Sequence, residues 1–363
     1  MTTSGQQDAF KDVMRDVAKG CIQAQASDVD ERSRFPEKGY QALASVGLLV
    51  AHLPEEVAGG GGGMLTSVMA IEQVARVCGS TAASVAATVQ AATALGYGAG
   101  QMARDRISQI ASGDHVAAWV GEGIGYTSTR KGYLLHGRGS WVANADRAQS
   151  LVVAADGQAS TDPGVALLLV ATDQAGVRIG AIETDLGLRG CSLRSVELND
   201  VLVSPPGLLG QGPSASAGLA CAAANHGLAV AALCVGVAAG ALDQARSYVL
   251  ERVQFGRRIA DFPAMRAILS EAFVSVDAAR QLVSSAAGQV DRGAAEDYVI
   301  SAALLSATET AAAVTIEAVQ AFGGYGYVKG YPVERMMRDA QVARLLIGSR
   351  AARLESVAAH FLA

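Results

Sequence analysis

The sequence predicts a fold in three parts: an N-terminal α-helical domain (residues 1–113), a central antiparallel β-domain (114–212) and a C-terminal four-helix bundle (213–363). Three observations predict it. Apolar residues recur at helical spacing up to residue 113, short apolar runs separated by turn residues follow His115, and long charge-poor segments follow Pro213. The composition, 50% hydrophobic and 17% charged, is that of a globular chain long enough for more than one domain.

Two segments, residues 30–49 and 67–77, define the first helical domain. The second places Val68, Ile71 and Val74 on one face at α-helical spacing. Between the two segments lies Gly59–Gly63, which is as glycine-rich as a phosphate-binding loop. Because no Lys-Ser or Lys-Thr pair follows it and no strand with dinucleotide spacing surrounds it, we expect a flexible surface loop instead.

The β-domain and the bundle are both predicted from the length and pattern of their apolar runs. Strands are expected over residues 116–120, 133–138, 151–155, 165–172, 177–182 and 195–203. Long helices are expected over residues 218–252, 263–291, 294–322 and 332–361. Helices that are apolar nearly all round must be buried on several sides, so the bundle is also expected to form an oligomer interface.

Charge and cysteine content exclude several classes of function. The net charge is −5, with 29 basic and 34 acidic residues spread along the chain, so nucleic acid is not an expected partner. The five cysteines include no C-x-x-C pair and no zinc spacing, which indicates free thiols and no metal site. The first 19 residues lack the apolar core of a signal peptide, and we expect a cytoplasmic protein.

One stretch without charged residues, Gly218–Leu242, must be weighed as a membrane span. It consists mostly of Ala, Gly and Val and contains Asn225 and His226, which makes it weakly hydrophobic for a bilayer. Small residues are better suited to close helix packing. We therefore expect a buried core helix and no membrane span.

Several segments, in order and spacing, carry a family pattern. In the C-terminal half they are Arg252-Val253-Gln254-Phe255-Gly256-Arg257, the run 318–327 with Gln320, Gly323 and Gly324, and the run 331–340. In the middle part they are Gly139–Asn144, which carries Trp141, and the stretch from Leu186-Gly187-Leu188-Arg189-Gly190 to Val201. Together they resemble the acyl-CoA dehydrogenase family over essentially the whole chain, and this resemblance implies an acyl-CoA dehydrogenase-like fold.

The resemblance implies that FAD lies extended at a subunit interface, partly held by the neighbouring subunit's C-terminal half. It assigns cofactor contacts to Arg252, Gln254, Phe255, Gln320, Gly323, Gly324 and Trp141. Their chemistry suits the task, because a guanidinium can bind a pyrophosphate with two hydrogen bonds and glycines let the backbone approach phosphate oxygens. From the residues alone, Arg252 could also form a helix-end ion pair, Phe255 could be a core aromatic and the glycines could cap a helix.

The sequence departs from the family pattern where the flavin ring and the catalytic base belong. The stretch Trp119–Ser128 is shorter than the family's flavin loop and largely rewritten, and Ala143 stands where a Thr is usual. Ile347 occupies the usual position of the catalytic Glu, and His226 the alternative one. Glu122 and Glu355 are other carboxylates without a motif. His226 could act as a base, although a lone histidine in an apolar helix is more often structural.

This combination predicts the base-lacking subunit of a heteromeric acyl-CoA dehydrogenase that desaturates a bulky acyl-CoA, by resemblance a steroid side chain. The expected partners are a second, similar subunit that carries the catalytic Glu and an electron-transfer flavoprotein that accepts electrons. Two alternatives stay open. The chain could be a self-sufficient dehydrogenase or flavin monooxygenase that uses His226, or it could be a scaffold subunit that binds no FAD. The sequence does not decide between CoA and an acyl carrier protein as the thioester carrier.

Overall fold

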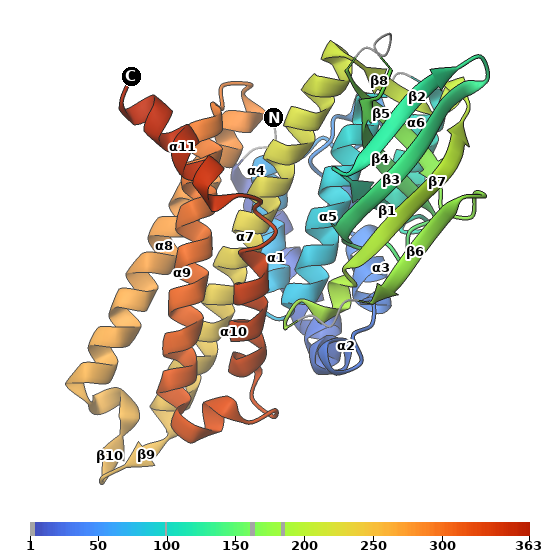
Figure 1. Cartoon of the computed structure of the whole chain (residues 1–363). Coiled ribbons are helices and arrows are strands. Elements are labelled where there is room, and N and C mark those ends of the chain that lie inside the picture. The colour runs from blue at the N-terminus through green and yellow to red at the C-terminus, as the bar shows by residue number, and fades with distance from the viewer. Residues whose placement is uncertain (1–3, 99, 160–163, 183–185) are drawn as a thin grey trace.

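A computed structural model describes residues 4–98, 100–159, 164–182 and 186–363, and it has the three predicted parts (Figure 1). The N-terminal part is helical, the middle part is a β-sheet, and the C-terminal part is a bundle of long helices. The first part comprises α1 (Ser4–Val17), α2 (Ala26–Glu31), α3 (Glu37–Ser45), α4 (Gly63–Ala75), α5 (Gly79–Gly96) and α6 (Gln101–Ala111). The segment predicted over residues 30–49 is interrupted before α3, because Pro36 fixes its own φ and lacks the amide hydrogen of a helix interior.

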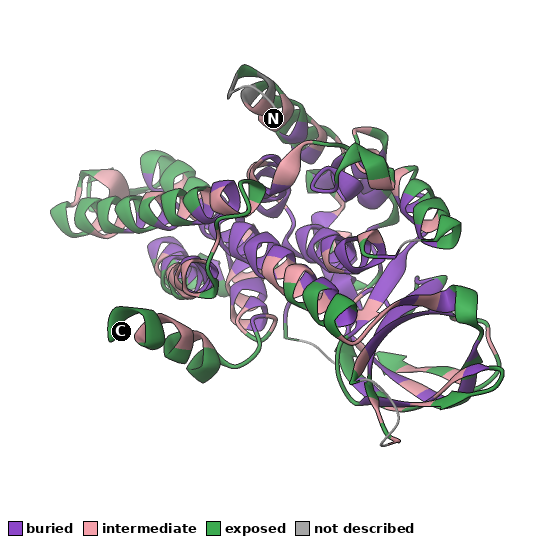
Figure 2. Ribbon diagram, turned by 90° about the horizontal axis from the view of Figure 1, so that it is seen from above, coloured by how far each residue is buried: buried purple, intermediate pink, exposed green. Residues whose placement is uncertain are grey.

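The middle part is one sheet of eight strands in the order β6-β7-β3-β2-β4-β5-β8, with β1 paired to β4. Its strands are β1 (Ala117–Val120), β2 (Ile124–Thr129), β3 (Gly132–Val142), β4 (Ser150–Gly157), β5 (Val165–Ala171), β6 (Val177–Ile182), β7 (Arg194–Val203) and β8 (Leu208–Gln211). The prediction of a purely antiparallel sheet is wrong at two pairings, because β1 and β2 both run parallel to β4. Figure 2 shows the sheet curling around its own apolar core.

The C-terminal part contains five helices and a small hairpin. The helices are α7 (Pro213–Glu251), α8 (Pro263–Asp291), α9 (Asp297–Phe322), α10 (Pro332–Ala343) and α11 (Arg350–Phe361), and the hairpin is formed by β9 (Val253–Gln254) and β10 (Arg257–Arg258). The helix predicted over residues 332–361 is divided in two. Gly348 adopts a left-handed φ of 71°, and the Ser349 side chain accepts a hydrogen bond from the Ala352 amide and so begins a new helix.

The two helical parts share one hydrophobic core, which includes α4, α5, α7, α8 and α9. Close approach of α4 and α7 depends on glycine: a Cβ at Gly240 would lie 2.2 Å from the Arg76 carbonyl oxygen. Residues 228–241 of α7 are buried, so the charge-free segment is a core helix as predicted (Figure 2). By length and composition alone, α7 and the segment Asp297–Tyr327 would also suffice to cross a membrane.

Candidate functional site

The Arg-x-x-Phe-Gly pattern forms an exposed hairpin at the end of the bundle (Figure 1). Gln254 pairs with Arg257, and Phe255 and Gly256 between them have positive φ values of 51° and 76°. Positive φ at both central residues is the geometry of a tight two-residue hairpin turn. The Phe255 side chain is 92% exposed, so within this chain it is not a core aromatic.

Arg252 and the Gly323–Tyr327 turn (η8) lie at the same end of the bundle. The guanidinium carbon of Arg252 lies 5.7 Å from the centre of the Tyr325 ring, a cation–π geometry. Within the part of the chain that the structure describes, Arg252 forms no ion pair. Gly323 ends α9 with a φ of 57°, and a Cβ on Gly323 or Gly324 would meet open space. The exposed Gln320 precedes them on the last turn of α9.

These residues therefore form an exposed group that consists of a cation without an ion pair among the described residues, an aromatic side chain, two amide side chains and two unobstructed backbone positions. Such a group can bind a phosphate-containing molecule that approaches from outside the chain, because Arg252 can donate two hydrogen bonds to a pyrophosphate. We refer to Arg252, Gln254, Phe255, Gln320, Gly323 and Gly324 as the hairpin group. The chemistry of the hairpin group, a guanidinium beside unobstructed backbone positions, suits the diphosphate part of FAD.

Trp141 lies elsewhere, on the sheet. It is 53% exposed and sits at an irregularity of β3 between Gly139 and Val142, where its φ is 58°. The rewritten stretch Trp119–Ser128 forms β1, an exposed turn at residues 121–123 and β2 of the same sheet. Figure 1 shows the sheet and the hairpin at opposite sides of the molecule. The structure thus brings the hairpin group together but does not bring Trp141 to it within one chain.

The two candidate positions for a catalytic base, Ile347 and His226, both lie near Arg353. Ile347 is buried between α10 and α11, and its carbonyl accepts a hydrogen bond from Arg353 Nε at 3.4 Å. His226 on α7 is half-buried, and its Nδ1 donates to the Ala86 carbonyl at 3.1 Å. Burial lowers the pKa of His226, and the positive charge of Arg353 lowers it further.

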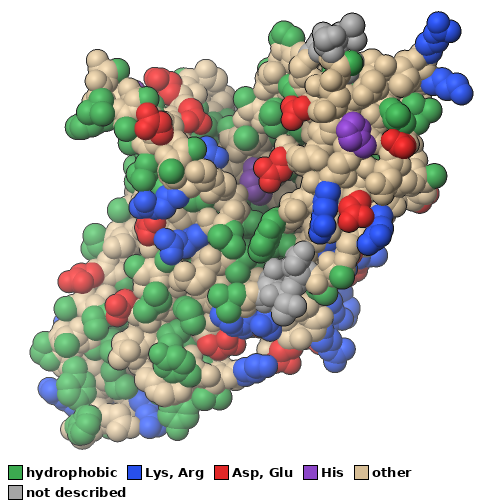
Figure 3. Space-filling model, in the orientation of Figure 1, with side chains coloured by type: hydrophobic (Ala, Val, Ile, Leu, Met, Phe, Trp, Pro, Cys, Tyr) green, Lys and Arg blue, Asp and Glu red, His purple; other side chains and the backbone are tan. Residues whose placement is uncertain are grey.

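The lowered pKa makes His226 a weak proton acceptor, and its Nδ1 is engaged by the Ala86 carbonyl, which agrees with a structural role. Neither of the two base positions holds a carboxylate. Glu122 is exposed in the turn between β1 and β2, and Glu355 is exposed on α11. In the view of Figure 3, the surface of the molecule is hollowed between the bundle and the sheet.

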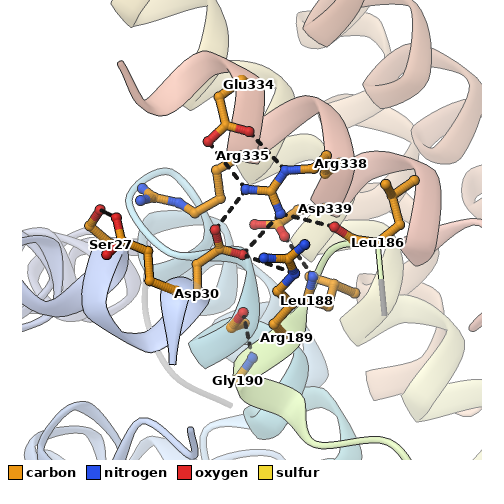
Figure 4. Close-up of polar contacts among 12 residues, drawn as sticks. Ser27, Asp30, Leu186, Leu188, Arg189, Gly190, Glu334, Arg335, Arg338 and Asp339 are labelled. Carbon is orange, nitrogen blue, oxygen red and sulfur yellow. Dashed lines mark hydrogen bonds and ion pairs between the residues drawn. The ribbon is translucent and has the colours of Figure 1, made fainter. Parts of the chain in front are cut away.

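The Arg-Asp pair in the run 331–340 has a structural function (Figure 4). Arg338 Nη1 and Nη2 donate to the two carboxylate oxygens of Asp30 on α2, at 3.0 and 2.6 Å. The same guanidinium binds Glu334 on α10 and the carbonyl of Leu186, at 2.8 and 2.9 Å. The arginine therefore links the N-terminal helices, the connection between β6 and β7 of the sheet, and the bundle.

Asp339 completes this link from the next position of α10. Its Oδ1 accepts a hydrogen bond of 2.6 Å from the Leu188 amide, and burial raises its pKa to about 6. Gly187 must be a glycine here, since a Cβ would lie 2.4 Å from the Arg338 carbonyl oxygen. The run 331–340 of the family pattern includes Arg338-Asp339, but nothing in the sequence pattern indicates the partner Asp30, which lies far away along the chain.

The glycine-rich loop is on the surface, as predicted, and is no phosphate site. The amides of residues 59–62 donate to the carbonyls of Pro54, Val50, Leu53 and Ala51, at 2.8 to 3.0 Å. They are therefore not free to bind an anion. Among the described residues no group of three or more His, Cys, Asp or Glu side chains could hold a metal ion, and all five cysteines are free thiols.

Family models match in three consecutive parts: acyl-CoA dehydrogenase N-terminal domain over residues 4–114, middle domain over 120–201 and C-terminal domain over 220–362. A Bacillus subtilis protein named probable acyl-CoA dehydrogenase is 31% identical over 355 residues, which cover 94% of this chain and 93% of the relative. The short-chain acyl-CoA dehydrogenase of Clostridium acetobutylicum is 28% identical, over 95% of this chain and 94% of the relative.

Solved structures with the same fold include butyryl-CoA dehydrogenase of Megasphaera elsdenii. It superimposes with a TM-score of 0.93 at 24% identity, and the match covers both chains completely. The FAD complex of PigA superimposes with a TM-score of 0.92 at 18% identity, over 99% of this chain and 98% of that chain. At these identities the likeness concerns the fold.

Proposed function

Because the chain belongs to the acyl-CoA dehydrogenase family and is an oxidoreductase of that type, we propose that it is the subunit without a catalytic base in a heteromeric acyl-CoA dehydrogenase. Its hairpin group contributes to an FAD that is shared across the interface with an unlike subunit. That partner supplies the flavin end of the site and the catalytic Glu. The substrate is a bulky acyl-CoA such as a steroid side-chain thioester, and electron-transfer flavoprotein accepts the electrons.

The proposal rests on the contrast between the candidate cofactor residues, which are present in this chain, and the catalytic base, which is missing. The hairpin group is intact and exposed, whereas the base positions hold Ile347 and a neutral His226. Desaturation of an acyl thioester needs a base at the substrate Cα, and FAD, when bound, accepts hydride from Cβ. A chain that offers one half of the cofactor contacts and no carboxylate at either base position is best explained as half of a composite enzyme.

Exposed apolar side chains on the bundle support an interface with another chain. Phe273 and Val274 on α8 are 62% and 65% exposed, and Leu345 after α10 is 61% exposed. Figure 3 shows apolar side chains gathered over this part of the molecule. Exposed apolar surface of this kind is typical of regions that are covered in an assembly.

Co-expression with the candidate partner subunit tests the proposal, with the visible flavin absorbance of the purified protein as the readout. We expect one FAD for each pair of unlike chains and little or none in this chain purified alone. Arg252→Ala should lower the flavin occupancy of the complex, because it removes charge-assisted hydrogen bonds of roughly 1.5–3 kcal/mol each. Arg266→Ala, on the exposed side of α8, is the matched control and should leave occupancy unchanged.

Each of the other possible results would contradict the proposal in a different way. A full flavin complement in the isolated chain would support a self-sufficient flavoenzyme and would refute the shared site. A complex in which Arg252→Ala leaves the flavin content unchanged would contradict the assignment of the hairpin group. A complex without flavin absorbance would refute the shared FAD site and would support the alternative that the chain is a scaffold subunit that binds no FAD.

A further inference from the structure

A groove of about 700 Å³ lies where α1 passes the end of α4, the last third of α7 and the middle of α8. Its volume falls in the range of small-molecule sites, roughly 300–1,000 Å³. On α7 the lining begins at Gly240, which at 1.5 Å per residue is about 21 Å along the helix from His226. The hairpin group, Trp141 and Ile347 do not line the groove either, so it is separate from the proposed cofactor and substrate site.

Gln73, near the end of α4, is a buried side chain of the groove wall that lacks a hydrogen-bond partner. It is 4% exposed, and its Nε2 has no acceptor among the described residues. The carboxylate of the neighbouring Glu72 is held by Arg280 Nε, with both oxygens at 3.0 Å. Native proteins satisfy nearly all buried polar atoms, so the unpaired amide indicates a partner that approaches from the groove. Because an amide nitrogen is a donor, that partner must supply an acceptor oxygen.

Positive charge lines the groove on the side of α1. Lys11, Arg15 and Lys19 follow one another at intervals of four residues, the spacing of neighbours on one helix face, and all three line the groove. Lys11 and Arg15 belong to α1, and Lys19 belongs to the helical turn Ala18–Ile22 that continues it. Arg15 pairs with Asp12 at 2.5 Å, whereas neither lysine has an ion pair among the side chains that the structure describes. Both ammonium groups are therefore available to an anion.

The carboxylates of the groove do not neutralise these lysines, because they bind the arginines of the opposite wall. Glu72 pairs with Arg280 at 3.0 Å and with Arg76 at 3.4 Å. Asp243 pairs with Arg76 at 2.6 Å, and Asp277 pairs with Arg280 at 2.9 Å. In all, five cations and three carboxylates line the groove, so its net charge is positive and it favours an anionic ligand.

We propose that this groove binds a small polyanion whose linked phosphate groups contact Lys11 and Lys19, and of which one oxygen accepts a hydrogen bond from Gln73 Nε2. Lysine binds phosphate as a point charge, and the two lysines are eight residues apart, about 12 Å along the helix axis. Two linked phosphate groups span more of this distance than a single phosphate does. Inorganic pyrophosphate and the diphosphate of a nucleotide share this chemistry. The proposal does not rest on the heteromeric function, because none of these residues belongs to the proposed cofactor site or to the base positions.

Isothermal titration calorimetry of the purified protein with inorganic pyrophosphate tests the proposal. A parallel titration with ADP identifies the source of the phosphates: tighter binding of ADP indicates a nucleotide, and equal or weaker binding indicates free pyrophosphate. We expect Lys11→Ala combined with Lys19→Ala to weaken pyrophosphate binding about tenfold, since each surface charge contributes about threefold. Lys38→Ala combined with Lys131→Ala, at two exposed positions outside the groove, changes the net charge equally and should leave the affinity unchanged. Arg252→Ala should also leave it unchanged, which separates this groove from the hairpin group.

Substitution of Gln73 separates ligand binding from a merely structural role. Gln73→Leu should weaken pyrophosphate binding about tenfold, the factor that corresponds to roughly 1.4 kcal/mol for one hydrogen bond to an anion. In the protein without ligand the same substitution removes an unpaired buried amide, so the urea midpoint should stay the same or rise. Absence of pyrophosphate binding, equal losses in the two double-lysine variants, or a loss in Arg252→Ala would each overturn the proposal. So would an unchanged affinity in Gln73→Leu, or a fall in the urea midpoint of that variant.

Discussion

Replacement of Arg338 by alanine tests whether the link between the three parts of the chain holds the molecule together. Arg338 makes two hydrogen bonds to Asp30, two to Glu334 and one to the Leu186 carbonyl. In Arg338→Ala the Asp30 carboxylate, which is 6% exposed, loses its bidentate partner and keeps only the longer ion pair with Arg189, at 3.9 Å. Removal of one member of a buried ion pair costs about 3–5 kcal/mol, and because Arg189 still compensates part of the Asp30 charge we expect the lower end of this range.

Urea unfolding followed by fluorescence of Trp119 and Trp141 measures this loss. With an m-value of about 3 kcal/mol/M, the midpoint should fall by about 1 M urea. Arg350→Ala is the matched control, since Arg350 is exposed and binds the exposed Glu309 at 3.1 Å. An exposed pair contributes at most about 1 kcal/mol, so the control midpoint should move by about 0.3 M or less. Equal shifts for the two variants would refute the structural role of Arg338.

Three further substitutions test the buried acid and the two base positions. Asp339 has a pKa raised to about 6, so the folded state binds its proton more tightly than the unfolded state and stability falls as pH rises from about 4 to about 6. Asp339→Asn keeps an acceptor for the Leu188 amide and should remove this pH dependence. It should raise the free energy of unfolding at pH 7 by up to about 3 kcal/mol. An unchanged pH profile in urea titrations would contradict the raised pKa of Asp339. His226→Asn should retain most of the activity of the native assembly in a dye-reduction assay, whereas a fall of about a thousandfold at constant flavin content would identify His226 as a general base. Ile347→Glu should give the isolated chain no dehydrogenase activity, because it buries an unpaired charge and leaves the flavin stretch altered; recovered turnover would mean that only the base had been missing.

Much of the secondary structure can be predicted from the local pattern of apolar and turn residues, and the elements that were predicted wrongly have local causes. Six of the strands and the three long bundle helices could be predicted, because their apolar runs are long and bounded by turn residues. Two strands were not predicted. β2 (Ile124–Thr129) begins within Trp119–Ser128, the stretch that was compared with the family's flavin loop, and β8 (Leu208–Gln211) is short and follows two prolines. The break at Gly348-Ser349 had a signal in the sequence, a glycine followed by a helix-capping serine.

The sequence by itself determined the family, the order of helical and β parts, and the absence of a carboxylate at Ile347 and His226, because these depend on residue identity and spacing along the chain. Tertiary structure alone decided which distant groups meet. It paired Asp30 with Arg338, ran β1 and β2 parallel to β4, and left Gln73 Nε2 without an acceptor among the described residues. It also separated the exposed hairpin group from Trp141. The physical reason is that hydrogen-bond satisfaction and burial are properties of atoms brought together by packing, and no local pattern in the chain encodes their partners.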